Sequence, residues 1–174
     1  MAAYVGTFMK RVAALVIAGL VLAPIAHAQT ACKEVGRISA SGLYRFDSIK
    51  GARATDEPED ELYESNASLF GHEDCLIDQY FEPVHACTWE FDTEASLMAA
   101  YNEKAEAIAP CLAGWEKQEL LVSDPAEAGY RTLAGVGYLG ADVYEMVVWA
   151  IIADFDPGRK IGRYRLVIEA TDYT

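Results

Sequence analysis

The fold is decided by residues 74–117, which read DCLIDQYFEPVHACTWEFDTEASLMAAYNEKAEAIAPCLAGWEK. From Leu97 to Trp115 the apolar residues recur at steps of three or four, which is typical of one face of an α-helix. We therefore predict a main amphipathic helix over about 93–117 that packs on one face of a sheet. Pro110 should kink or restart it, because proline has no backbone N–H to donate.

Two strand-like runs, 74–81 and 85–91, precede this helix. In the second run apolar and polar residues alternate, and a period of two predicts a half-buried strand. The join at 82–84 is short and contains proline, which suits a hairpin turn. The apolar face of this hairpin is the expected floor for the helix.

The rest of the chain predicts the other elements of an α+β fold. Residues 32–49 favour a second, N-terminal helix, although 43–49 can also be read as a strand. Residues 143–155 favour a central strand, although 143–153 also fits a buried helix. Further strands are predicted at 65–70, 119–123, 130–139 and 160–170. The prediction is a single two-layer domain with an antiparallel β-sheet of about five to seven strands and the 93–117 helix on one face.

The N-terminus has the pattern of a secretory signal peptide. Lys10 and Arg11 precede the apolar run 12–23, and 26–28 form an A-x-A cleavage site. The apolar run is too short to span a bilayer. We expect cleavage after residue 28, a mature domain of residues 29–174 in the periplasm of a bacterium or secreted, and no stable membrane insertion after cleavage.

The four cysteines are expected to form two disulfides, because an even number in an exported chain is the usual disulfide framework. They are Cys32, Cys75, Cys87 and Cys111. The sequence contains no C-x-x-C pair, the spacing that would favour a zinc site over disulfides. The preferred pairing is Cys75–Cys87 across the hairpin with Cys32–Cys111. The rival pairing is Cys87–Cys111 with Cys32–Cys75.

The charge of the mature chain points to its partners. After residue 28 there are 12 basic and 27 acidic residues, which leave a net charge of −15. This disfavours nucleic acid and anionic membranes as partners and favours a basic protein in the cell envelope. The candidate docking loop holds Asp56, Glu57, Glu59, Asp60 and Glu61. It lacks the ligand spacing of an EF-hand, and a plain solvated loop is the simpler alternative.

No catalytic motif stands out. There is no G-x-S-x-G, and the glycines of 135–140 match G-x-G-x-x-G without the following helix that a dinucleotide site needs. His72 and His85 can outline a metal or acid–base site across the hairpin, but a buried, hydrogen-bonded histidine is the commoner outcome for His85. We expect no cofactor and favour a non-enzymatic role.

Three function classes therefore remain. The preferred one is a non-catalytic protein-interaction, inhibitor or immunity-type domain. The second is a small-ligand carrier with a pocket between helix and sheet, flanked by Tyr101, Trp115 and Trp149. The third is a hydrolase that uses dispersed carboxylates or His72 and His85.

Overall fold

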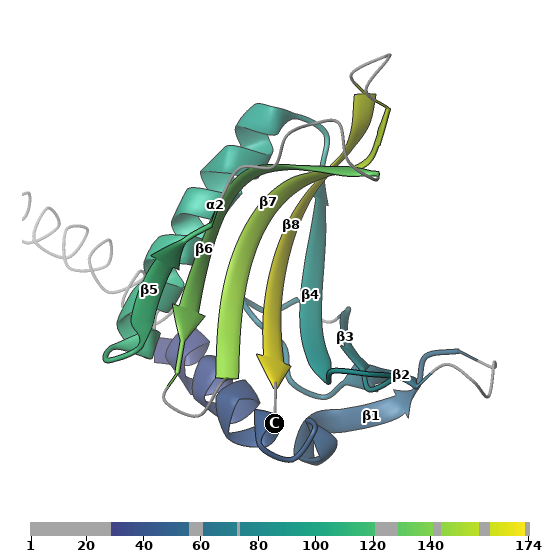
Figure 1. Cartoon of the computed structure of the whole chain (residues 1–174), viewed down its shortest axis with the longest axis vertical. Coiled ribbons are helices and arrows are strands. Elements are labelled where there is room, and N and C mark those ends of the chain that lie inside the picture. The colour runs from purple at the N-terminus through teal and green to yellow at the C-terminus, as the bar shows by residue number, and fades with distance from the viewer. Residues whose placement is uncertain are drawn as a thin grey trace, which may run out of the picture.

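The main element of the fold is a sheet of eight antiparallel strands in the order β1-β2-β3-β4-β8-β7-β6-β5 (Figure 1). The computed structural model describes residues 29–55, 61–72, 74–120, 129–140, 144–156 and 161–172, so the predicted signal peptide lies outside the described residues. The strands are β1 (Lys50–Arg53), β2 (Leu62–Ser65), β3 (Cys75–Asp78), β4 (Val84–Phe91), β5 (Glu116–Glu119), β6 (Tyr130–Leu139), β7 (Tyr144–Asp156) and β8 (Ile161–Asp172). The α+β class is confirmed, but the predicted five to seven strands are too few.

The sequence predicts neither β1 nor β2; the acidic loop that holds Asp56 to Glu61 is expected in this part of the chain. These strands are short and largely polar, KGAR and LYES, so no apolar alternation marks them. The strand predicted at 65–70 is wrong: the strand ends at Ser65 and the chain then turns.

The centre of the sheet follows the prediction closely. β7 lies between β8 and β6, as expected for a strand that is apolar on both faces. Met146 and Val148 of β7 and Leu166 and Ile168 of β8 are at most 1% exposed. Helix α2 (Glu94–Ile108) contacts both strands and also β4, so these side chains belong to the layer between helix and sheet.

Helix α2 begins where its sequence predicts and ends earlier. Thr93 caps the first turn, because its hydroxyl oxygen accepts a hydrogen bond from the Ser96 N–H at 3.2 Å. The α-helix ends at Ile108 rather than near residue 117, and a 3₁₀ turn, η2 (Ala109–Leu112), follows with Pro110 in its first turn. The missing N–H of proline explains this change of helix type.

The N-terminal helix covers residues 29–42, so it is shorter than the predicted 32–49. The chain then turns at 43–46 and passes through the 3₁₀ helix η1 (Asp47–Ile49) into β1. Val35 and Ile38 of this helix are buried in the same core as Leu97 of α2. No helix in the described part of the chain is long and apolar enough to cross a membrane.

Two disulfides tie these elements together with the preferred pairing. Cys32–Cys111 joins the N-terminal helix to η2, and Cys75–Cys87 joins β3 to β4. The second bond connects residues that face each other directly in the β3–β4 register. The rival pairing is therefore wrong, and the described residues contain no free cysteine.

Candidate functional site

The structure describes only the end of the predicted acidic docking loop. Asp56, Glu57, Glu59 and Asp60 lie outside the described residues, whereas Glu61 is exposed just before β2. The backbone oxygen of Glu61 accepts a hydrogen bond from the Gln79 N–H at 2.9 Å. Glu61 is thereby anchored next to the turn at 79–83, which connects β3 to β4.

Gln79 is buried in the middle of this region, with 6% of its surface exposed. Its side-chain amide donates to the backbone oxygen of Arg45, and its own backbone oxygen accepts from Arg45 Nη2 at 2.5 Å. Its side-chain oxygen accepts from Lys50 Nζ at 3.1 Å. A buried amide is stable only when its polar atoms are paired, so these bonds fix the 79–83 turn against the 43–46 turn.

Four large apolar side chains are exposed on the two turns that Gln79 and Arg45 join. We call this set the aromatic end: Leu43, Tyr44, Tyr80 and Phe81. Phe81 is 81% exposed and lies edge-to-face with Tyr80, with ring centroids 4.4 Å apart. The sequence reading missed these residues because it placed 80 and 81 at the end of a strand. Their position next to the proline turn was the available signal.

The turns that carry the aromatic end are held in defined conformations. The Tyr80 N–H donates to Asp78 Oδ1 at 2.9 Å, which closes a turn just after β3. Arg45 has a φ of 53°, in the left-handed region that non-glycine residues seldom occupy. The paired bonds between Arg45 and Gln79 stabilise that conformation, so the exposed side chains project from a fixed backbone.

Acidic groups border the aromatic end. Glu61, Leu62, Asp78 and Tyr80 line a surface hollow of about 330 Å³. Glu61, Asp78 and the neighbouring Glu82 are all exposed. Carboxylates beside an aliphatic and an aromatic wall suit the ammonium or guanidinium group of a lysine or arginine side chain, together with its apolar stem.

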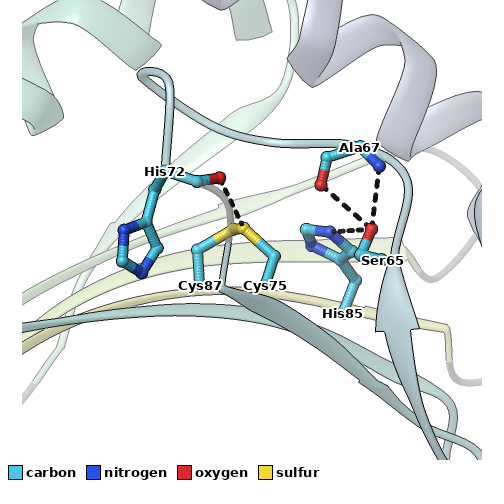
Figure 2. Close-up of a disulfide and its surroundings, with 6 residues drawn as sticks. All are labelled: Ser65, Ala67, His72, Cys75, His85 and Cys87. Atoms are coloured by element: carbon cyan, nitrogen blue, oxygen red, sulfur yellow. Dashed lines mark hydrogen bonds between the residues drawn. A yellow bond between two sulfur atoms is a disulfide. The ribbon is translucent and has the colours of Figure 1, made fainter. Parts of the chain in front are cut away.

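The histidines predicted as a possible site do not face one another. Figure 2 shows the Cys75–Cys87 disulfide between the rings of His72 and His85. The ring of His72 stacks on Trp89, with centroids 4.5 Å apart. His85 is 0% exposed, so no substrate can reach it directly. The two histidines therefore form no shared acid–base site.

The hydrogen bonds of His85 indicate which ring nitrogen carries the proton. Nε2 lies 3.0 Å from Ser65 Oγ, and that hydroxyl donates to the backbone oxygen of Ala67 while accepting from the Ala67 N–H (Figure 2). With the hydroxyl proton assigned to the Ala67 oxygen, the Ser65 oxygen is left to accept from His85. Nε2 then carries the hydrogen, and Nδ1, which has no hydrogen-bond partner, presents a bare lone pair.

Burial also keeps His85 neutral. Removal from water lowers the pKa of His85 from 6.5 to about 4, against backbone hydrogen-bonding contacts that act in the opposite direction. The imidazole is uncharged at neutral pH and is held by Ser65. This residue is thus a core histidine of the hairpin, as the commoner outcome predicted, with one unused nitrogen.

The three aromatic residues proposed to flank a carrier pocket do not lie around one cavity. Tyr101 and Trp115 pack against the core between helix and sheet. Trp149 follows the buried Val148 in β7 and therefore points to the other face of the sheet. There it covers Gly135, where an added Cβ would lie 2.7 Å from the indole ring.

Comparison with known proteins gives no match to a family model, to a curated protein or to a solved structure. The geometry of the described residues therefore carries the functional argument. Of the predicted site residues, the four cysteines pair as disulfides, and Glu61 lies beside the aromatic end.

Proposed function

We propose that this chain is an exported, non-catalytic interaction domain that binds a basic protein at the aromatic end. The observation that carries the proposal is that hydrogen bonds between Arg45 and Gln79 join two turns, 43–46 and 79–83, each of which carries exposed apolar side chains, with exposed acids beside the second turn. Clustered exposed apolar groups are typical of binding sites, and aromatic side chains are the commonest anchors of protein interfaces. The net charge of −15 on residues 29–174 supports a basic partner.

The fixed backbone supports the same proposal. Ordering an interface on binding costs free energy, and a surface that is already ordered avoids this cost. Gln79 and Arg45 order both turns in the free protein. Export, periplasmic or extracellular location, and an inhibitor or immunity-type role against a secreted basic protein are parts of this proposal. The two disulfides support an oxidising compartment.

In the proposed mode, Phe81 and Tyr80 enter an apolar depression of the partner. A lysine or arginine of the partner occupies the hollow between Glu61 and Asp78. The carrier and hydrolase alternatives receive no comparable support, since the described residues bring together neither a pocket flanked by the three aromatics nor a histidine pair.

The test uses the mature protein and two matched serine variants as baits in a cell-envelope extract of the producing organism. Phe81→Ser removes the most exposed ring, whereas Tyr130→Ser removes a ring that is 53% exposed at the start of β6. Tyr130 pairs with Ala153, at the end of β7 away from the 79–83 turn, so it serves as the control.

We expect the mature protein and Tyr130→Ser to retain a basic protein, and Phe81→Ser to bind it at least tenfold more weakly. Raising the salt concentration from 50 to 500 mM should weaken the complex, because charge contributes to it. Equal retention by all three baits at both salt concentrations would contradict the proposal.

A further inference from the structure

The base of the β3–β4 hairpin holds a group of metal-ligating side chains that the proposed function does not use. We call Cys75, Cys87 and His85 the buried centre. One ligand atom from each lies within 4.8 Å of the others, and the three residues are at most 1% exposed. Cys75 faces Cys87 in the register, and His85 lies two residues before Cys87 on the same face of β4 (Figure 2). The strand pairing thus brings two sulfur atoms and one imidazole to a single point.

The unused nitrogen of His85 is the independent indication of a ligand. Nδ1 is buried and has no hydrogen-bond partner, whereas Nε2 is fixed by Ser65. Histidines that bind metals characteristically present one bare nitrogen to the ion and donate a hydrogen bond from the other. His85 already has this arrangement in the disulfide form.

We propose that the buried centre, when its disulfide is reduced, binds one Zn²⁺ ion through the sulfur atoms of Cys75 and Cys87 and Nδ1 of His85. Thiolate sulfur and imidazole nitrogen are the preferred ligands of Zn²⁺ in proteins. Two thiolates and a neutral imidazole cancel the charge of the ion, so the complex is neutral, as a fully buried position requires. The disulfide and the metal are then alternative states of the same two cysteines.

The conversion is a two-electron reduction followed by ligand exchange. A dithiol reductant gives two electrons and two protons to the Cys75–Cys87 bond, which breaks into two thiols while the reductant closes its own disulfide. Zn²⁺ then displaces both protons as it binds the thiolates. Before the disulfide first forms during export, the thiols are already present and no reductant is needed.

The surroundings allow the required geometry. Zinc–sulfur bonds of about 2.3 Å place two thiolates roughly 3.8 Å apart in a tetrahedral site, so the sulfur atoms must separate by side-chain rotation. The backbone oxygen of His72 lies 3.6 Å from Cys75 Sγ and is near enough to complete the coordination. The 66–72 segment that carries this oxygen lies over the centre (Figure 2).

The experiment uses residues 29–174, reduced with a phosphine that is then removed under anaerobic conditions, and titrates them with Co²⁺ as a spectroscopic substitute for Zn²⁺. We expect one Co²⁺ per chain, absorption from thiolate-to-cobalt charge transfer, and displacement by one equivalent of Zn²⁺. The oxidised protein should show no such absorption. Circular dichroism before and after the addition reports whether the reduced chain keeps its fold.

Three variants locate the site. His85→Leu should bind Co²⁺ at least tenfold more weakly, whereas His72→Leu should bind it within twofold of the unmodified chain. Replacing Cys75 and Cys87 by serine should abolish the absorption although the thiols of Cys32 and Cys111 remain, which assigns it to Cys75 and Cys87. The proposal is overturned if the absorption is absent, if the His85 variant binds as tightly as the unmodified chain, or if the reduced chain stays unfolded with Zn²⁺ present.

Discussion

The Cys32–Cys111 disulfide provides the sharpest test of how the fold is stabilised. Replacing both cysteines by alanine removes a bond between residues 79 positions apart. This bond restricts the unfolded chain strongly, because the cost of closing a loop grows with its length. Without this bond, the 29–42 helix should be held less firmly on the rest of the domain, where its Val35 and Ile38 are buried in the core.

The magnitude follows from the loop length. A sequence separation of 79 corresponds to a chain-entropy contribution of about 4.5 kcal/mol at 25 °C. The separation of 12 for Cys75–Cys87 corresponds to about 2.8 kcal/mol. A domain of this size typically has about 5–15 kcal/mol of stability, so the Cys32→Ala/Cys111→Ala variant should lose roughly a third of it or more.

The assay is urea denaturation at pH 7 followed by tryptophan fluorescence, with thermal unfolding as a second measurement. The free energy of unfolding should fall by about 4 kcal/mol and the melting temperature by roughly 10–15 °C. Each single alanine variant breaks the same bond and should cost nearly as much as the double variant. A double variant that loses less than about 1.5 kcal/mol, or single losses that simply add, would refute the reasoning.

Three further predictions concern the core and the outer face of the sheet. Burial raises the pKa of Glu169, Glu145 adds to the rise and the Trp149 hydrogen bond opposes it. The folded state therefore holds the Glu169 proton at higher pH than the unfolded state, and Glu169→Gln should gain stability over the parent as pH rises from 4 to 8 in urea titrations. Leu97→Ala should cost roughly 2–5 kcal/mol in the same assay, since Leu97 is 0% exposed. Gly135→Ala should cost roughly 1–3 kcal/mol and alter the fluorescence of Trp149, because the new Cβ would meet its ring.

The parts of the fold that the sequence predicts are those with strong periodicity. β6 and β7 match the expected runs within one residue at each end, and the start of α2 matches within one residue. Each carries a pattern that burial imposes along the whole element, with period two in strands and 3.6 in the helix. The preferred disulfide pairing also followed from such patterns, since a hairpin brings Cys75 opposite Cys87.

The parts that the sequence does not predict depend on contacts between distant segments. β1 and β2 are polar strands at one edge of the sheet. β2 pairs with β3 and β1 pairs with β2, and this pairing orders segments whose side chains show no strand pattern. The aromatic end depends on hydrogen bonds between Arg45 and Gln79, which are 34 residues apart. No local pattern indicates such a pairing, so the joining of these two turns could not be predicted.

The β3–β4 hairpin links the two proposals. Its 79–83 turn presents Tyr80 and Phe81, and its base holds the buried centre. In the disulfide form a covalent bond holds Cys75 opposite Cys87, and in the proposed zinc form two metal–sulfur bonds hold the same pair. Either state keeps these two residues opposite each other, as the β3–β4 register places them. The reduced, metal-free state lacks both constraints. In that state the aromatic end should no longer be held in one conformation, and its affinity for the partner protein should be lowest.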